Sequence, residues 1–316
     1  MRTIVTGGAG FIGSHVVDGI VDAGAEVLVI DDLSRGQWSN LERSMKSGTR
    51  LVEMDVRDGG AIESLFRSFR PELVFHLAAQ VDVRSSMDDP ARDADVNVLG
   101  SVSVFAAAHA SGASRVVNTS TGGAIYGEAA VVPTSEDEPA EPESAYGLSK
   151  RAAEQYAAWF RRTHGLDVVT LRYGNVYGPR QDPDGDAGVI ALFCDRALSG
   201  RRPIVYGDGT QTRDYVFVGD VVAANLAAAA ARALPHDVYN IGTGTEVSVL
   251  QLADAVAAVA GISPSAFEPE FRPARPGELT RSCLDVHRAQ SELRLPPPAP
   301  LTDGLKYTLD WMIARG

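Results

Sequence analysis

The segment Thr6-Gly7-Gly8-Ala9-Gly10-Phe11-Ile12-Gly13 decides which fold this sequence predicts. It follows a short β-branched run and leads into a helix whose apolar residues recur with helical spacing. Gly7 suits a tight turn, Gly10 lets the backbone approach a pyrophosphate, and Gly13 lets the helix pack closely on the strand. Because a helix N-terminus favours anions, this strand–turn–helix unit predicts a dinucleotide site lined by Gly7, Gly10, Phe11, Ile12 and Gly13.

A second predicted strand, residues 27–30, ends in two acids, Asp31 and Asp32. An acid about 20 residues beyond the glycine segment is typical of dinucleotide-binding units. Asp31 can accept both hydroxyl groups of an adenosine ribose, whereas a 2′-phosphate would meet two carboxylates. The pair therefore favours NAD over NADP, the alternative being a solvated strand end.

Two further predicted strands, 51–54 and 73–77, end at the edge where open α/β sheets bind their ligands. The first leads to residues placed to meet an adenine, and the second to small residues that leave room for a cofactor. These residues are Asp55, Val56, Leu77, Ala78 and Ala79. Asn97 lies on the following helix, where its spacing fits a cofactor contact and an ordinary polar residue equally well.

Strands alternate with helices up to about residue 173, which predicts an α/β fold with a Rossmann-like, doubly wound parallel sheet. We assign residues 1–174 to an NAD-binding domain, to which 214–233 returns. Beyond 174, proline and glycine become denser and the alternation ends. We therefore expect 175–316 to form mainly a smaller substrate-binding lobe, from segments near 175–200 and 235–285.

Charge and composition exclude several classes of function. The 316 residues carry a formal net charge of −12, whereas sequence-independent binding of nucleic acid needs a basic face. Two cysteines are too few for a disulfide framework, and the chain shows no apolar signal segment, so we expect a reduced, cytoplasmic protein. No apolar run is long enough to predict a membrane span, and no metal site is expected.

Tyr146 and Lys150 are four residues apart on a predicted helix, so both side chains lie on one face. A fixed cation beside a phenol favours the phenolate and lowers the pKa of the tyrosine from about 10. Tyr146 is therefore a candidate acid/base for a hydroxyl group. A tyrosine and a lysine exposed on a helix are the alternative, and the glycine segment makes the catalytic interpretation the stronger one.

Nearly the whole chain resembles the extended short-chain dehydrogenase/reductases, and within them the NAD-dependent UDP-sugar epimerases. The resemblance rests on TGGAGFIG at 6–13, HLAA at 76–79, NTSTGGAIYG at 118–127, YGLSK at 146–150, RYGNVYGPR at 172–180 and GDGTQTRDY at 207–215. It implies tightly bound NAD, Tyr146 as the base and Lys150 as a ligand of the nicotinamide ribose. It also implies a bridging hydroxyl, for which we choose Thr121. Because Gly122-Gly123 makes this segment one residue longer than the usual pattern, Ser120 stays the alternative.

The resemblance also implies a UDP-sugar site in the second half of the chain. Asn175 matches a residue beside the sugar phosphate, and Arg213 and Arg275 match ligands of the diphosphate. Arginine suits that role because its forked donors fit phosphate oxygens. The remaining implied substrate residues contact the uracil, the uridine ribose, the sugar pocket and the region near the sugar C6. They are Tyr206, Glu278, Ser282 and Arg84, respectively.

Within this family the residues after Thr121 indicate which reaction follows oxidation at C4. Related dehydratases and decarboxylases place an acid there, whereas Gly122 and Gly123 follow here, and Glu128 is the next acid. We therefore expect 4-epimerisation of UDP-glucose and UDP-galactose, with UDP-glucuronate as the second choice of substrate. A 4,6-dehydratase and a non-catalytic NAD-binding regulator are the weaker alternatives. The resemblance further implies a homodimer formed through the helix of Tyr146.

Overall fold

The computed structural model describes residues 1–182, 188–275 and 277–315. Within them, parallel strands form a seven-stranded central sheet in the order β11-β6-β5-β4-β1-β2-β3. Its strands are β1 Arg2–Thr6, β2 Glu26–Asp31, β3 Arg50–Glu53, β4 Leu73–His76, β5 Arg115–Thr121, β6 Val168–Tyr173 and β11 Val238–Ile241. This is the Rossmann-like α/β sheet that the alternating pattern predicts, with the reversal of strand order beside β1.

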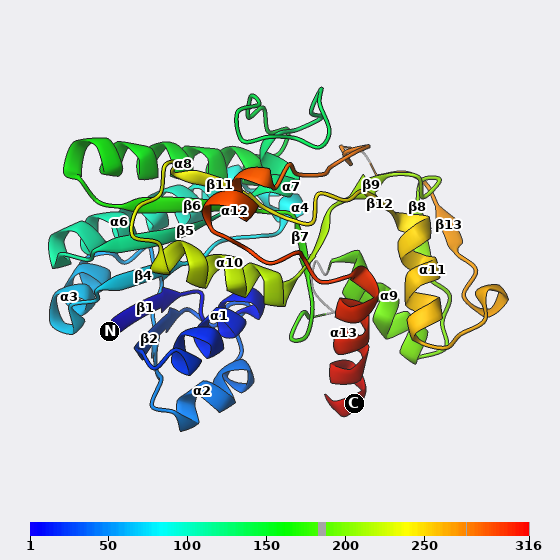
Figure 1. Ribbon diagram of the computed structural model, residues 1–316, viewed down its shortest axis with the longest axis horizontal. Coiled ribbons are helices and arrows are strands. Elements are labelled where there is room, and N and C mark those ends of the chain that lie inside the picture. The colour runs from blue at the N-terminus through cyan, green and yellow to red at the C-terminus, as the bar shows by residue number, and fades with distance from the viewer. Residues whose placement is uncertain (183–187, 276, 316) are drawn as a thin grey trace.

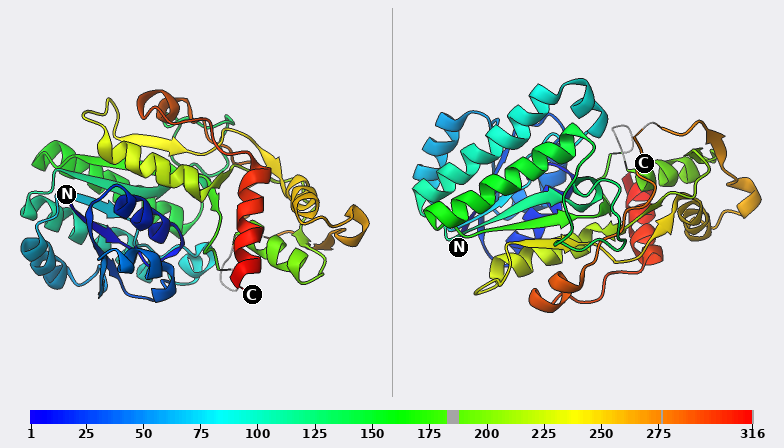
Figure 2. Two further views of the ribbon diagram at one scale, coloured as in Figure 1. Left: turned by 60° about the horizontal axis from the view of Figure 1, so that its bottom comes forward. Right: turned by 90° about the horizontal axis from the view of Figure 1, so that it is seen from above.

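Helices cover both faces of this sheet, as Figures 1 and 2 show. Each face is sealed by its own apolar cluster, which explains the short continuous apolar runs in the central strands β2 and β4. One face carries α1 Phe11–Asp22, η1 Trp38–Leu41, α10 Val218–Ala230 and α12 His287–Glu292. The other carries α3 Gly59–Phe69, α6 Gly100–Ser111 and α8 Ala145–His164.

Short elements complete the large part of the molecule around the ends of these strands. They are α2 Glu42–Lys46, α4 Val83–Asp88, α5 Pro90–Ala94, η2 Asp95–Leu99 and α7 Gly122–Ile125. All of them except α2 pack against α8. Among the described residues, no helix is both long and apolar enough to cross a membrane.

The remaining elements form a smaller lobe, at the side of the large part where α9, α11 and α13 lie in Figure 1. Its helices are α9 Val189–Leu198, α11 Val249–Val259, η3 Pro264–Ala266 and α13 Leu301–Arg315, which enclose a third apolar cluster. Its strand pairs are β8 Ile204–Tyr206 with β13 Glu270–Arg272, and β9 Thr212–Arg213 with β12 Val247–Ser248. The parallel pair β7 Asn175–Tyr177 and β10 Tyr215–Phe217 connects the two parts.

The chain crosses between the two parts more than once. After β10, helix α10 packs against α1, and β11 pairs with β6 at the edge of the central sheet. The sequence analysis assigns residues from 235 onward to the smaller lobe, whereas β11 lies in the large sheet. The difference arises because β11 comes after the strand–helix alternation has ended and takes its place by pairing with the distant β6.

Candidate active site

A cavity of about 780 Å³ opens at the carboxyl ends of the central strands and extends toward β7 and β10. Nearly every residue that the sequence predicts for the cofactor lines it. These residues are Gly7, Gly10, Phe11, Ile12, Gly13, Asp31, Asp32, Asp55, Val56, Leu77, Ala78, Ala79, Tyr146 and Lys150. The structure thus brings together strand ends that are far apart in the sequence, because parallel strands end at the same edge of the sheet.

The glycine turn between β1 and α1 is closed by contacts that leave no space for side chains. Gly7 has a φ of 68°, and its N–H donates to the carbonyl of Ile30 at 2.8 Å. A Cβ atom on Gly13 would lie 2.0 Å from the carbonyl oxygen of Gly7. The first turn of α1 therefore approaches the end of β1 as a helix N-terminus that binds a pyrophosphate must.

Asp31, the last residue of β2, lines the cavity. Its two carboxylate oxygens accept hydrogen bonds from the N–H groups of Ala9 and Leu33, both at 2.9 Å. Burial raises the pKa of Asp31, and these backbone hydrogen bonds oppose the rise. A Cβ atom on Gly36 would lie 2.5 Å from Asp31 Oδ1, so glycine is needed where the loop passes the carboxylate. A glycine-lined cradle with a fixed acid beside it fits the dinucleotide that the sequence predicts.

Asn97 is buried behind the cavity wall and does not line the cavity. Its Oδ1 accepts from the N–H of Gln80 at 2.8 Å, and its Nδ2 donates to the carbonyl of Gln80 at 3.0 Å. The same Nδ2 lies 3.1 Å from Asp93 Oδ1 and 3.0 Å from Ser149 Oγ. Asn97 therefore fixes the loop after β4 to helix α8, and any effect on a cofactor is indirect, through Gln80, Asp93 and Ser149.

Tyr146 and Lys150 lie one turn apart near the start of α8 and both line the cavity. Ser144 caps the helix by accepting from the N–H of Gly147 at 3.1 Å, and the N–H of Tyr146 donates to Ser86 Oγ at 3.0 Å. These bonds fix the first turn of α8 against α4. The phenol and the ammonium group are thereby held over the carboxyl end of the sheet.

Burial dominates the ionisation of both groups. It raises the pKa of Tyr146 to about 12, while a hydrogen bond with Thr121 lowers it and the charge of Asp93 raises it. It lowers the pKa of Lys150 to about 8, against the charges of Glu154 and Asp93. The sequence-based argument that Lys150 lowers the pKa of Tyr146 therefore does not describe the free protein, in which desolvation of the phenol is the larger effect.

The two hydroxyl groups at the end of β5 have different partners. Thr121 is hydrogen-bonded to Tyr146, whereas Ser120 Oγ is buried without a hydrogen-bond partner. Both residues line the cavity. Because a bridging hydroxyl must reach the phenol, the geometry supports Thr121 over Ser120.

The predicted substrate residues form two groups. Asn175, Thr121 and Tyr146 line the cavity, where a Cβ atom on Gly123 would lie 3.3 Å from Asn175 Oδ1. The others do not line it, and they come from α4, β8, β9 and the segment 275–282 of the smaller lobe. They are Arg84, Tyr206, Arg213, Arg275, Glu278 and Ser282.

Within the second group the side chains contact one another. The Arg275 guanidinium lies 3.7 Å from the centre of the Tyr206 ring, and Arg213 pairs with Glu278 at 3.5 Å. A hydrogen bond with Arg275 lowers the pKa of Tyr206, and the charge of Arg84 acts in the same direction. The N–H of Ser282 donates to the Thr212 carbonyl at 3.2 Å, which places Ser282 beside β9.

Several residues that line the cavity have no counterpart in the sequence-based site. Gln80 is hydrogen-bonded to Asp93, and the charge of Lys150 acts on Asp93. Residues from the β6–α9 region and from β10 form another wall: Tyr173, Tyr177, Arg180, Gln181 and, from β10, Tyr215. Gln80 follows a predicted strand end and could have been found by that signal, whereas Asp93 sits in a short helix without a motif of its own. No cluster of three or more potential metal ligands occurs within the described ranges.

Comparisons with known proteins agree with this geometry. Residues 3–242 match the model of the NAD dependent epimerase/dehydratase family. The chain is 45% identical to a UDP-glucose 4-epimerase of Mycolicibacterium smegmatis, with 98% of each chain covered.

Two solved structures are similar over the whole length. A UDP-glucose 4-epimerase of Thermotoga maritima with UDP-glucose is 43% identical, has a TM-score of 0.94, and is matched over 100% of this chain and 99% of that one. A UDP-glucose 4-epimerase of Thermus thermophilus in complex with NAD is 40% identical, has a TM-score of 0.92, and is matched over 100% of both chains.

Proposed function

The chain belongs to the NAD-dependent epimerase/dehydratase family, and from that membership we propose that it catalyses the 4-epimerisation of a UDP-sugar. The observation that carries the proposal is the joint placement of Thr121, Tyr146 and Lys150 in the cavity that holds the dinucleotide cradle. The full-length similarity to UDP-glucose 4-epimerases at 40–45% identity supports the same reaction. A non-catalytic regulator would have no need of these three residues together.

NAD is the cofactor that the residues fit. The glycine turn leaves space for a pyrophosphate at the start of α1, and Asp31 stands at the ribose end of the same cavity. NAD supplies the hydride acceptor and, in its oxidised form, a positive nicotinamide ring that favours a nearby phenolate. We assign Lys150 to the nicotinamide ribose, and Asp55 and Val56 to the adenine.

Tyr146 holds and moves the proton of the sugar 4-hydroxyl. With a pKa of about 12 it is a neutral phenol in the free protein near pH 7, so it becomes a base only when the bound ligands favour its ionised form. Thr121 bridges the sugar O4 and the phenol. Proton transfer from O4 to Tyr146 accompanies oxidation of C4, and the return transfer follows reduction on the other face.

The surroundings of Thr121 support epimerisation over elimination. Gly122 and Gly123 follow it, and a Cβ atom on Gly122 would lie 2.5 Å from the Leu284 side chain, so the segment is packed closely. The next acid, Glu128, accepts a hydrogen bond from the N–H of Thr280. Elimination of water needs an additional acid/base group near the sugar, and this segment supplies none.

UDP-glucose and UDP-galactose are the substrates we favour. A glucuronate substrate would need a cation near the sugar C6, and Arg84, the candidate for that role, does not line the cavity. If Ser282 borders the sugar, its small side chain leaves space for an N-acetyl substituent. UDP-glucuronate is the second choice.

The test is an epimerase assay on the purified protein. UDP-glucose is incubated without added NADH and the nucleotide sugars are separated, and the expected product is UDP-galactose at equilibrium with its epimer. Parallel incubations with UDP-N-acetylglucosamine and UDP-glucuronate rank the substrates. A 4-keto-6-deoxy product would identify a dehydratase, and no conversion of any of the three would contradict the proposal.

A homodimer is the assembly we propose, formed through the solvent face of α8. Leu148, Tyr156 and Trp159 follow one another at helical spacing and are 58%, 44% and 41% exposed. Leu99 of η2, the segment packed against α8, is also 58% exposed. An apolar face of this kind marks a protein interface more often than it stays in contact with water.

Light scattering after size exclusion tests this assembly. A dimer is expected for the unmodified protein and a monomer for Leu148→Glu, with Leu198→Glu as the control at another exposed leucine. A monomeric parent would contradict the proposed dimer.

As compartment we propose the cytoplasm, since Cys194 and Cys283 are both free thiols in buried positions.

A further inference from the structure

Asp93 is a buried carboxylate beside the catalytic turn, and the mechanism above does not use it. Its side chain lies on α5, is 1% exposed, and lines the cavity together with Tyr146 and Lys150. Oδ1 accepts from Gln80 Nε2 and from Asn97 Nδ2, both at 3.1 Å. Oδ2 is buried without a hydrogen-bond partner. Burial raises the pKa of Asp93, while a hydrogen bond with Ser149 and the charge of Lys150 oppose the rise, so its ionised form depends on these neighbours.

A hydrogen-bonded chain ties Asp93 to the first turn of α8. Asn97 donates to Asp93 and also to Ser149 Oγ, and that hydroxyl donates to the carbonyl of Tyr146 at 2.9 Å. Gln80 adds a second connection from the loop after β4. The carboxylate is therefore held in a fixed place relative to Tyr146 and Lys150.

Lys150 is a buried cation whose charge has to be balanced. Within the described part of the chain, the anions that act on it are Glu154, one turn further along α8, and Asp93. Both oxygens of Glu154 accept from Arg172, at 2.9 and 2.7 Å, so the charge of Glu154 is already matched. Asp93 is the other anion that acts on Lys150, and no ion pair among the described residues matches its charge.

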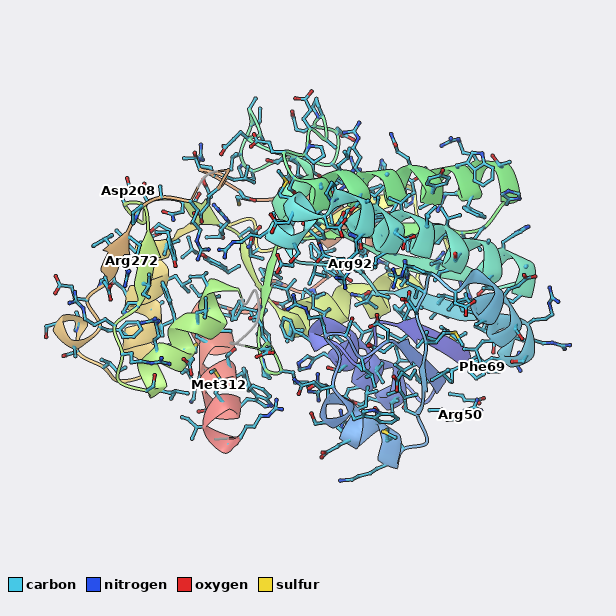
Figure 3. All side chains as sticks on the ribbon, turned by 180° about the vertical axis from the view of Figure 1, so that it is seen from behind. Arg50, Phe69, Arg92, Asp208, Arg272 and Met312 are labelled. Atoms are coloured by element: carbon cyan, nitrogen blue, oxygen red, sulfur yellow. The ribbon has the colours of Figure 1, made fainter. Side chains whose placement is uncertain are left out.

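Other ionisable groups on the elements packed against α8 do not replace it. His76 on β4 is neutral, because burial, with the charge of Lys150, lowers its pKa to about 3. The remaining groups are engaged elsewhere: Arg115 of β5 with Asp167, Asp95 of η2 with Arg57, His109 of α6 against the His164 ring, and Arg84 of α4 near Tyr206. Arg92, which is labelled in Figure 3, is an exposed neighbour of Asp93 in α5.

We propose that Asp93 is a positioning residue whose carboxylate is the counter-ion that keeps Lys150 protonated in the buried site. The inference rests on the proposed function, in which Lys150 acts as a cation beside Tyr146. An opposite charge nearby stabilises the ammonium form of Lys150, and the same negative charge opposes ionisation of Tyr146. Loss of the charge should therefore shift both ionisations in the same direction, toward lower pH.

The chain contains three lysines, Lys46, Lys150 and Lys306, which makes a direct measurement possible. Lysine is labelled at the side-chain carbon next to the amino group, and its NMR signals are titrated in the protein as purified, at a measured nucleotide content. Lys150→Met assigns the signal. In Asp93→Asn the pKa of Lys150 should fall by about one unit, the size expected for a nearby charge. In Asp93→Glu, which keeps the negative charge, the pKa of Lys150 should stay close to that of the parent.

Asp95→Asn is the matched control, because Asp95 lies in the adjoining turn, has a side chain that is 43% exposed, and pairs with Arg57. It should leave the Lys150 titration unchanged. Asp93→Ser is the second neutral variant should Asp93→Asn fail to fold. An unchanged Lys150 titration in a folded neutral variant overturns the proposal, as does an equal shift in Asp95→Asn.

Kinetics supply an independent measurement. In Asp93→Asn the alkaline limb of the kcat profile should move to lower pH by about the same amount, with the KM for UDP-sugar within a few-fold of the parent. A uniform loss of kcat at every pH would indicate a structural role and contradict the proposal. Because the lysine titration needs no substrate, it decides the role of Asp93 even if the protein proves not to be an epimerase.

Discussion

Burial moves the pKa values of Tyr146 and Lys150 in opposite directions. The phenol is easy to keep neutral in an apolar site, whereas the ammonium group is not, and the two pKa values are moved toward neutral forms of both groups. The free site therefore holds a protonated phenol and a lysine that titrates close to neutrality. A site with these properties depends on its ligands and on buried anions to reach the reactive ionisation states.

The first prediction is that Tyr146→Phe lowers kcat by at least about 100-fold, in line with the contribution of a general acid/base. The ring stays in place, so NAD should still bind. Steady-state kinetics with NAD content measured after acid release check both parts. Tyr307→Phe, on the exposed surface of α13, should behave as the parent. A Tyr146→Phe variant within a few-fold of the parent would remove this residue from the mechanism.

The second prediction concerns how much the burial of the charged Lys150 lowers the free energy of unfolding. A pKa lowered from 10.5 to about 8 means that folding disfavours the charged lysine, by about 3 kcal/mol below pH 8. The penalty fades as pH rises through about 8 to 10.5, because the unfolded state holds more protons in that range. Lys150→Met should thus raise the free energy of unfolding near pH 7, by less than this penalty because Asp93 loses a nearby positive charge, while abolishing activity.

Urea unfolding of the parent and Lys150→Met between pH 7 and 10 gives the test. The difference in free energy should shrink as pH rises. Lys306→Met, at an exposed position of α13, should show little difference at any pH. A less stable Lys150→Met variant would show that the lysine is well solvated or fully paired in the fold.

For single residues, the sequence predicts a functional role only where the residue lies within a motif. Tyr146, Lys150 and Thr121 lie in recognisable segments, and the structure places all three at one cavity. Asp93 has no such motif, because its importance comes from contacts between α5, the loop after β4 and α8 that no local pattern encodes. The pKa of Tyr146 was misjudged for the same reason: spacing shows a neighbouring charge and does not show the degree of burial.

Among the elements, the glycine turn and α1 form the most constrained unit. Its geometry depends on the absence of a side chain at Gly13, where a Cβ atom would overlap the Gly7 carbonyl. Gly13→Ala is therefore predicted to displace α1 from the end of β1 and to lose NAD. Gly60→Ala, in the first turn of α3, is the control, since its Cβ atom would meet only Asp58 at 3.8 Å.

Bound nucleotide and the melting temperature of the two variants are the measurements. Gly60→Ala should match or slightly exceed the parent, because alanine favours a helix by up to about 1 kcal/mol over glycine. Gly13→Ala should lose both NAD and stability. Full retention of NAD in Gly13→Ala would show that the loop can rearrange around a methyl group, contrary to the packing described above.

Long periodic elements were predictable and short ones were not. Strands up to β6 alternate with helices in a pattern that predicts parallel pairing, and the central sheet confirms it. Beyond residue 174 the strands have two to four residues and take their places through pairing with distant partners, such as β12 with β9. Such pairing is decided by tertiary packing, which single-sequence periodicity does not report.

In the whole molecule, the two predicted ligand sites belong to different parts. The predicted cofactor residues lie along the edge of the central sheet, whereas Tyr206 and Arg213 belong to β8 and β9 of the smaller lobe (Figure 1). Arg275 contacts Tyr206, and Glu278 pairs with Arg213. We propose that the nucleotide sugar joins them, with its sugar at Tyr146 and its diphosphate and uridine on the lobe. The parallel pair of β7 and β10 connects the two parts, so a ligand beside this pair can contact both.

The last prediction tests that bridge at Arg213. Its side chain is 14% exposed and pairs with Glu278 at 3.5 Å, so the free protein already holds the guanidinium in the lobe. A charge-assisted hydrogen bond to a diphosphate contributes roughly 1.5–3 kcal/mol, and Arg213→Ala should raise the KM for UDP-sugar about 10- to 150-fold. The value of kcat should change little, because the lost contact is equally strong before and during the reaction. Arg201→Ala, which removes a surface arginine of the same lobe paired with Asp195, should leave KM unchanged. A normal KM in Arg213→Ala would place the diphosphate elsewhere, and an equal rise in Arg201→Ala would reduce the effect to the general charge of the lobe.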